Sequence, residues 1–363
     1  MRRGPFPKPR RAPILTAMTP RPASALALGL DTFGDVTAAP DGSLLPHARV
    51  IRDVVEEAAL ADEVGLDFFG IGEHHRADFA VSSPEILLAA IAARTRRIRL
   101  GSAVTVLSSD DPVRVFQRFA TLQAVSDGRA EVILGRGSFT ESFPLFGYAL
   151  DQYETLFEEK LDLFAALLKG GAVTWRGTTR AALSGQRVFP TLEAPLTAWI
   201  GVGGSPESVV RAARHDMPLM LAIIGGDPAR FRPYVDLSHR AYAQLGRPVR
   251  PIGVHSPGYV AETDAQAREE VFPDYKRMRD RIGAERGWPP LTRDEFEREA
   301  DHGSLYVGGP ETVARKIATT ARALGLSRFQ LKYSAGPLAH DRLMRCIDLY
   351  GRRVAPLVRA MLA

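Results

Sequence analysis

The stretch IRLGSAVTVLSSDDPVRVFQRFATLQAVSDGRAEVILG, residues 98–135, decides the fold class. Its first nine and last six residues are mostly apolar, as in parallel strands that are buried on both faces. Between them, Pro112 opens an amphipathic stretch that ends at the turn sequence Asp127-Gly128. A strand, a helix and a second strand in this order predict one βαβ unit of a parallel sheet.

The same alternation runs along the rest of the chain. Apolar runs predict strands at residues 26–30, 68–72, 98–106, 130–135, 198–203, 219–224, 252–254 and 328–333. Helical patterns lie at residues 49–64, 84–93, 112–125, 150–168, 206–215 and 310–324. Eight strand–helix units in about 340 residues favour a (β/α)₈ TIM barrel, with a doubly wound open sheet as the alternative.

Two segments interrupt this alternation. Residues 171–195, after the fourth strand, and residues 263–306, after the seventh, are longer than simple connections. The second contains a charged helical stretch, 264–286, and a capping box formed by Thr292 and Glu295. It is a candidate lid over the C-terminal end of the barrel.

The charge distribution argues against nucleic acid as a partner. Residues 1–22 carry six basic and no acidic side chains, whereas the rest of the chain has 41 basic and 42 acidic residues, so its body is neutral. The first 22 residues are rich in proline and arginine and are expected to be a disordered tail. We expect residues 23–363 to form a single barrel domain.

Residues and motifs that the sequence lacks exclude further classes of protein. The single cysteine, Cys346, permits no intrachain disulfide and favours a reducing, cytoplasmic location. No apolar run approaches the roughly 20 residues of a membrane helix. The sequence has no CxxC or HExxH motif, so no metal site is expected. Neither a complete G-x-G-x-x-G nor a P-loop motif is present.

The motif GIGEHH, residues 70–75, closes the second strand. Strand ends of this kind face the active site of a barrel. Neighbouring residues of an extended chain point in opposite directions, so one histidine should face the pocket and the other should hydrogen-bond the scaffold. The alternative is a polar strand end whose groups are satisfied by loops.

Two further motifs offer groups for an anion. In ILGRGS, residues 133–138, Arg136 lies between two glycines where an anion can approach, unless it pairs with Glu131 or Glu141. In IGVGGSPESVV, residues 200–210, backbone N–H groups at a helix start form a phosphate cradle or a simple capped turn.

A second cradle has a similar sequence. VGGPETVARKI, residues 307–317, carries the same type of turn at Gly308-Gly309. Spacing alone does not choose between the two, but the fourth and fifth strands are neighbours, so Arg136 favours the first cradle. The small residues of SAVTVL, 102–107, would let a flat ring lie against the third strand, or they form an ordinary core strand.

Together these motifs resemble those of the bacterial-luciferase-like flavin monooxygenases. The likeness is strongest over residues 50–146, through LDFFGIGEHH, RIRLGSAVTVLSSDDPVRV, SDGRAEVILGRGS and FPLFGY, and continues more weakly to about residue 226. It implies a (β/α)₈ barrel that binds reduced FMN. The cysteine of the light-emitting luciferase is replaced here by Gly135, which argues against light emission.

The resemblance also implies roles for individual residues. His74 would transfer protons, and Glu73 and His75 would orient the site. The Ala103–Val104 bond would be a non-proline cis peptide against which the flavin ring lies. The phosphate would be held by Arg136 with its neighbours Gly135 and Gly137, and by Gly203, Gly204, Ser205 and Ser208. Pocket walls are expected from Phe33, His75, Phe139, Ile223 and His255.

The implied activity is oxygenation of a small, largely apolar organic substrate by reduced FMN and dioxygen. A separate flavin reductase would supply the reduced flavin, because no nicotinamide-binding motif is present. Members of this superfamily usually pair, so a homodimer is expected. The alternatives are a hydride-transferring reductase or dehydrogenase that uses F420 or FMN, and a non-catalytic flavin-binding protein.

Overall fold

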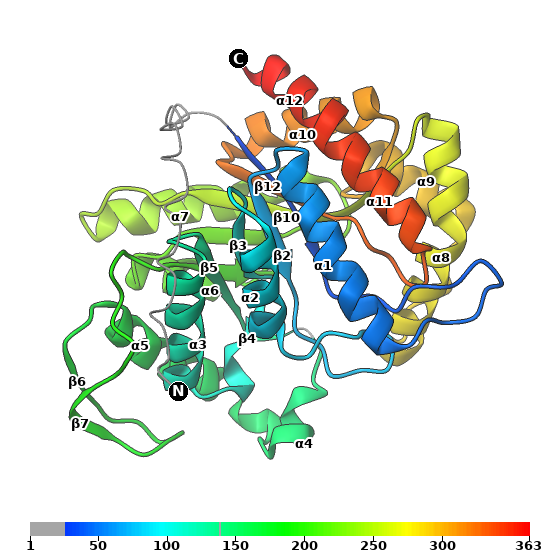
Figure 1. Ribbon diagram of the computed structural model, residues 1–363. Helices are drawn as coiled ribbons and strands as arrows, with labels where there is room; N and C mark the ends of the chain where they lie inside the picture. The colour runs from blue at the N-terminus through cyan, green and yellow to red at the C-terminus, as the bar shows by residue number, and fades with distance from the viewer. Residues whose placement is uncertain (1–25, 138) are drawn as a thin grey trace, which may run out of the picture.

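The computed structural model describes residues 26–137 and 139–363. The expected tail, residues 1–22, lies outside the described residues. Within them, eight parallel strands pair in chain order, and the last pairs with the first, so the sheet closes into a barrel (Figure 1). These strands are β1 (Ala27–Thr32), β2 (Phe68–Ile71), β3 (Arg99–Ser102), β5 (Ala130–Gly135), β8 (Thr197–Val202), β9 (Leu219–Ala222), β10 (Ile252–Val260) and β12 (Arg328–Lys332). The predicted (β/α)₈ barrel is confirmed.

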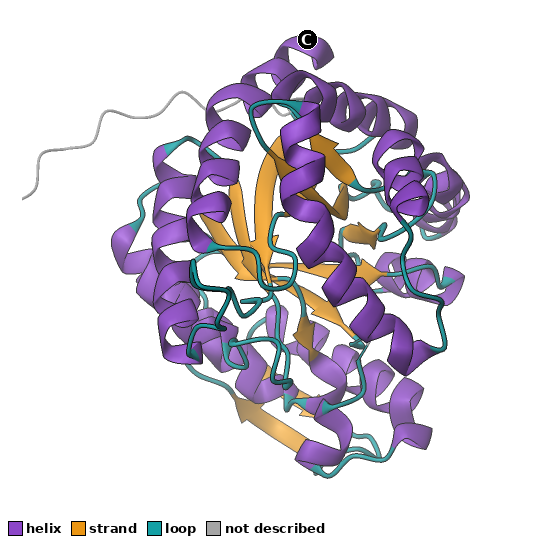
Figure 2. Cartoon of the chain, turned by 90° about the vertical axis from the view of Figure 1, so that its right-hand side faces the viewer, coloured by secondary structure: helices purple, strands orange, loops and turns teal. Residues whose placement is uncertain are grey.

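Helices surround the barrel on its outer side (Figure 2). They are α1 (His47–Glu63), α2 (Pro84–Arg94), α3 (Pro112–Val125), α4 (Ser142–Phe146), α5 (Tyr153–Leu168), α6 (Pro206–Arg214), α7 (Arg232–Gln244), α10 (Pro310–Leu324), α11 (His340–Leu349) and α12 (Ala355–Leu362). Short turns η1 (Leu107–Ser109), η2 (Leu150–Gln152), η3 (Pro228–Phe231) and η4 (Tyr350–Val354) join some of them. None of the helices in the described residues combines the length and apolarity that crossing a membrane requires.

Both insertions form structure of their own. The first carries the antiparallel hairpin β6 (Ala172–Trp175) and β7 (Leu183–Arg187), and the second carries α8 (Asp264–Arg286), α9 (Arg293–His302) and β11 (Tyr306–Gly308). Figure 1 shows the hairpin and the α8–α9 pair on opposite sides of the molecule. The predicted capping box at the start of α9 is present. The two-residue strand β4 (Thr105–Val106) extends the pairing along β5.

Side chains alternate along each strand between the barrel interior and the helix layer. On β12, Phe329 and Leu331 belong to the apolar core between strands and helices, whereas Arg328, Gln330 and Lys332 point inward. The same parity on the other strands determines which residues can reach a site inside the barrel.

A buried polar and aromatic cluster fills the N-terminal part of the barrel. Arg328 donates two hydrogen bonds to Glu131, at 2.7 and 3.0 Å, and Trp199 donates a third at 2.8 Å. The Arg328 guanidinium also lies 4.7 Å from the Phe68 ring centroid. Because this buried charge pair is fully hydrogen-bonded, it is tolerated there, and the open space lies above it at the carboxyl ends of the strands.

Candidate active site

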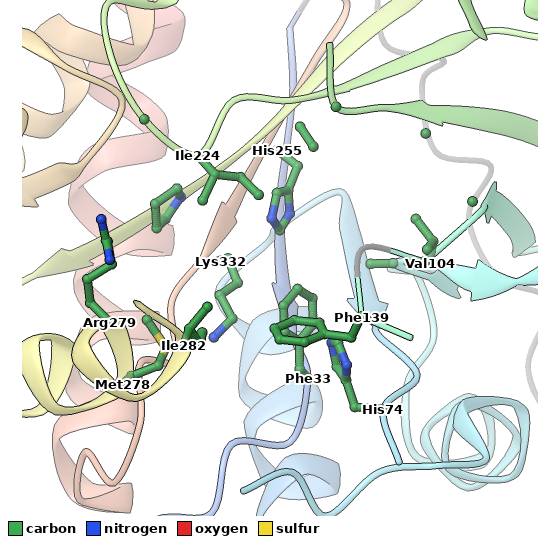
Figure 3. Close-up of a pocket in the computed structure, with 18 of the residues that line it drawn as sticks. Phe33, His74, Val104, Phe139, Ile224, His255, Met278, Arg279, Ile282 and Lys332 are labelled. Carbon is green, nitrogen blue, oxygen red and sulfur yellow. The ribbon is translucent and has the colours of Figure 1, made fainter. Parts of the chain in front are cut away.

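A cavity of about 950 Å³ occupies the carboxyl ends of the barrel strands, and residues of α8 and α9 are part of its lining. Figure 3 shows Met278, Arg279 and Ile282 of α8 on one side of it. Active sites of barrel enzymes lie at this end. Most of the residues that the sequence predicted for the site border this cavity. They are Phe33, Glu73, His74, His75, Ala103, Val104, Gly135, Arg136, Gly137, Phe139, Gly203 and His255.

The two histidines after β2 have different partners. His75 Nε2 lies 2.9 Å from Glu73 Oε1, and Glu73 Oε2 accepts a hydrogen bond from the Val106 backbone N–H at 3.1 Å. Glu73 therefore ties His75 to the end of the third strand. Both histidines border the cavity. Glu73 links His75, but not His74, to the scaffold.

His74 is enclosed by aromatic rings. The ring centroids of Phe79, Phe33 and Phe139 lie 4.4, 4.8 and 5.1 Å from that of the imidazole. The His74 side chain retains 12% of its exposure. An imidazole held in this way is shielded from bulk water while it still faces the cavity.

Glu141 is the polar partner of His74 and was not predicted in that role. Its Oε1 lies 3.4 Å from His74 Nδ1. Burial opposes ionisation of Glu141, but the hydrogen bond with His74 and nearby backbone groups outweigh it, so the pKa of this carboxyl is below its ordinary value. The ionised carboxylate can only accept, so His74 Nδ1 carries the hydrogen and Nε2 remains available.

One wall of the cavity is flat and built from small residues. The Ala103–Val104 peptide bond is cis, as the resemblance implied. Val104 packs closely on Gly135, where an added Cβ would come within 2.6 Å of the Val104 side chain. Glycine at 135 is therefore required by this packing.

Arg136 lies at one end of the cavity and is paired with a carboxylate. Its partner is Glu154 of α5, not Glu131 or Glu141 as the sequence analysis considered. Glu154 is 60% exposed, and it also lies 3.4 Å from Arg211 Nη2. The pKa of the Glu207 carboxyl on α6 is lowered, mainly by hydrogen bonds from the Ser205 side chain and from the Glu207 backbone. The positive charge of Arg136 also contributes, so Arg136 lies near the start of α6.

The loop before α6 presents open backbone beside this arginine. An added Cβ at Gly203 would meet nothing within 4 Å, and Gly204 has φ of +125°. Ser205 caps α6 through the Ser208 N–H. Gly204, Ser205 and Ser208 do not border the cavity itself, and the Ser208 hydroxyl accepts a hydrogen bond from Arg211.

The competing cradle at Gly308-Gly309 is already filled from within the chain. Asp264 Oδ1 accepts a hydrogen bond from the Gly309 N–H at 2.6 Å, and Asp264 Oδ2 accepts one from the Thr312 hydroxyl at 2.9 Å. A side-chain carboxylate thus occupies the position that a phosphate would take at this helix start.

The prediction that Ile223 lines the pocket is wrong. Ile223 is fully buried in the core between strands and helices, and its neighbour Ile224 borders the cavity instead. The reason is the alternation of side chains: residues 220, 222 and 224 face inward, so residue 223 faces outward.

Gln330 and Lys332 of β12 form a further wall of the cavity and were not predicted, whereas His255, which also borders the cavity, was. Lys332 donates to both carboxylate oxygens of Asp35 at 2.9 Å and lies 4.7 Å from the Phe33 ring centroid. His255 Nδ1 lies 2.8 Å from Asp31 Oδ2. A signal for this wall exists in the sequence: polar residues at 328, 330 and 332 alternate within a strand that is otherwise apolar.

The residues present fit a flavin. Ala103, Val104 and Gly135 offer a wall against which a ring system could lie, and Arg136 with the open backbone at Gly203 offers groups for a phosphate. The cavity volume is within the range of ordinary cofactor sites.

Comparisons with known proteins show what the chain is similar to. The 4-hydroxyprotoasukamycin monooxygenase of Streptomyces nodosus subsp. asukaensis is 26% identical over 333 residues, which cover 86% of this chain and 87% of that protein. The oxygenating constituent of 3,6-diketocamphane monooxygenase from Pseudomonas putida, solved with FMN, superposes with a TM-score of 0.72 at 19% identity, covering 92% of this chain and 98% of that one.

A third similar protein has a different named cofactor. An F420-dependent secondary alcohol dehydrogenase superposes with a TM-score of 0.73 at 15% identity and covers 92% of this chain and 99% of its own. At these identities the two solved structures show the shared fold alone. The luciferase-like monooxygenase family, by contrast, matches the sequence itself over residues 32–328, so the chain belongs to this family of oxidoreductases.

Proposed function

We propose that the protein is a monooxygenase that uses reduced FMN and dioxygen to oxygenate a small organic substrate with a largely apolar body. The observation that carries this proposal is His74, which faces a covered cavity from inside a box of phenylalanine rings. Oxygenation needs a site from which water is excluded, and a proton-transfer group within it.

FMN is favoured over F420 by the charges beside Arg136. The basic residues at this rim are already paired with carboxylates: Arg136 with Glu154, and Arg211 with both Glu154 and Glu158. One phosphate can replace one exposed carboxylate at Arg136. A longer polyanionic tail such as that of F420 would meet further acidic side chains there, which costs energy.

The chain's own residues would divide the work as follows. Bound reduced FMN would supply the electrons that activate dioxygen. Arg136 and the backbone before α6 would hold the phosphate, and the wall at Ala103-Val104 would support the ring. His74 would hold or deliver a proton at Nε2 while Glu141 fixes Nδ1, and Glu73 would keep His75 in place.

Several further features belong to the same proposal. A separate flavin reductase would supply the reduced cofactor, and residues 23–363 would act as one domain in a cytoplasmic homodimer. The paired chains would each carry a complete cavity, because every residue named above comes from one chain.

The test is oxygen labelling with reduced FMN. Photoreduced FMN and the protein are mixed with ¹⁸O₂ and a panel of apolar compounds, and products are analysed by mass spectrometry. The proposal predicts one ¹⁸O atom in a product, with the yield lowered in His74→Ala. Substrate reduction or oxidation with F420 under anaerobic conditions, with no labelled product from FMN, would instead identify a hydride-transferring enzyme.

A further inference from the structure

Arg279 of α8 is a cation in the cavity wall that forms no hydrogen bond or ion pair with a carboxylate within the described residues, although its charge adds to the hydrogen bonds that lower the pKa of the Asp280 and Glu295 carboxyls. It borders the cavity, and its Nη1 atom is buried without a hydrogen-bond partner. The guanidinium lies 4.2 Å from the ring centroid of Trp288, which supports it from one side. A buried donor without a partner costs free energy, so its retention requires an explanation.

Other arginines of the same helix are paired. Arg268 forms ion pairs with Glu297 and Asp301, and Arg281 lies 3.6 Å from Asp78. These side chains bind α8 to its neighbours. Within the described residues Arg279 forms no such ion pair, and its guanidinium instead lies over Trp288, just beyond the end of α8.

Asp280, which follows Arg279 in the chain, and Glu295 and Glu299 of α9, which border the cavity, are held by other groups. Asp280 accepts hydrogen bonds from Lys276 and from the Leu291 N–H, both at 2.6 Å. Glu295 accepts from the Thr292 N–H at 3.0 Å, and Glu299 accepts from the Gly226 N–H at 3.1 Å. Within the described residues, none of these three carboxylates forms a hydrogen bond or an ion pair with the Arg279 guanidinium.

Arg279 also has a defined place relative to the proposed reaction site. Figure 3 shows Arg279 at one side of the cavity and His74 and Val104 at the other. Met278 and Ile282, beside Arg279 on α8, make part of the intervening wall apolar, and Lys332, the cation that Figure 3 shows between the two sides, is already paired with Asp35. A ligand that spans this distance would therefore contact a cation at one end and apolar surface along its length.

We propose that the substrate carries a carboxylate, which Arg279 binds, while the apolar remainder extends toward His74. This proposal rests on the proposed function, whose substrate class it specifies. A guanidinium matches a carboxylate through two parallel hydrogen bonds, and pairing in a partly buried site is stronger than at an exposed surface. Specificity would follow, because a neutral analogue would leave Arg279 without a partner.

The test compares straight-chain carboxylates from hexanoate to dodecanoate with the primary alcohols of the same length. Binding to the full chain, without flavin, is measured by isothermal titration calorimetry. We expect at least one carboxylate to bind wild type about tenfold or more tightly than its alcohol, the range for a charge-assisted hydrogen bond. Arg279→Met should abolish this preference, and Arg279→Lys should keep part of it.

Arg277→Met is the matched control, because Arg277 is on the same helix, 65% exposed, and 3.9 Å from Asp274. This variant loses the same charge and should keep the full preference. Equal binding of carboxylates and alcohols by wild type, or an unchanged preference in Arg279→Met, would overturn the proposal. The calorimetric assay contains no flavin, so it tests the carboxylate site independently of oxygenation. If the preference for carboxylates depends on Arg279 but the ¹⁸O₂ assay yields no labelled product, the monooxygenase proposal is refuted and the carboxylate site is not.

Discussion

Replacing Glu154 by glutamine should strengthen FMN binding, while replacing Arg136 by alanine should weaken it. In the structure Glu154 holds the guanidinium that we assign to the phosphate, so the phosphate must displace a carboxylate. Glu154→Gln removes that competitor and leaves the size of the side chain unchanged. The two substitutions therefore act in opposite directions on one interaction.

The magnitudes follow from the exposure of each partner. Glu154 is 60% exposed, so its pair with Arg136 contributes only about 0.2–1 kcal/mol, and Glu154→Gln should tighten FMN binding by about 1.5–5-fold. Arg136 is 24% exposed and would make a charge-assisted bond to the phosphate. Arg136→Ala should cost about 1.5–3 kcal/mol, or roughly 10–150-fold in affinity.

Quenching of flavin fluorescence gives the affinities, with riboflavin as the control ligand that lacks the phosphate. Riboflavin should bind wild type, Glu154→Gln and Arg136→Ala about equally. In the double variant the gain from Glu154→Gln should disappear, because the cation that it frees is gone. If Arg136→Ala binds FMN as wild type does, the phosphate lies elsewhere and the reasoning fails.

The remaining predictions concern proton transfer, stability and assembly. His74→Ala should lower turnover by about 10²–10⁴-fold with FMN affinity retained; a larger loss of turnover in His75→Ala would reverse the two assignments. Burial favours the neutral form of Asp35, but Lys332 together with the hydrogen bonds from Ser334 and the Gly336 N–H outweighs burial, so the pKa of Asp35 is below the ordinary 3.8. This network therefore stabilises wild type near pH 7, and its contribution is lost as the pH falls through the lowered pKa. Lys332→Met should lower the free energy of unfolding by about 3–5 kcal/mol at pH 7. The loss should be smaller near pH 4.5, where the unpaired and buried Asp35 takes up a proton, and urea denaturation at both pH values measures the difference. Sedimentation at micromolar concentration should show a dimer, and a monomer would contradict the proposed assembly.

The sequence predicted the barrel well because its strands are buried on both faces. Apolar runs of this kind, separated by amphipathic helices, leave few alternative architectures. The helix Arg232–Gln244 was not predicted, because polar and charged residues interrupt its apolar ones and it starts with Arg232-Pro233 directly after the turn η3. Its position depends on packing against α6 rather than on a strong pattern of its own.

The site was predicted in part, and the errors have two causes. The motifs that resemble the family placed His74, Arg136 and the cis bond correctly at the cavity. Glu141 and Arg279 were missed because their relation to the cavity depends on how a loop and an inserted helix fold back over it. The error at Ile223 was one of parity, since a shift of one residue along a strand exchanges the two faces.

The most direct test of the central claim is the anaerobic binding of photoreduced FMN, compared with reduced F420. We predict that reduced FMN binds one equivalent per chain, that Arg136→Ala weakens this binding tenfold or more, and that reduced F420 binds less tightly than FMN. Tighter binding of reduced F420 than of reduced FMN, or no measurable binding of reduced FMN, would contradict the account.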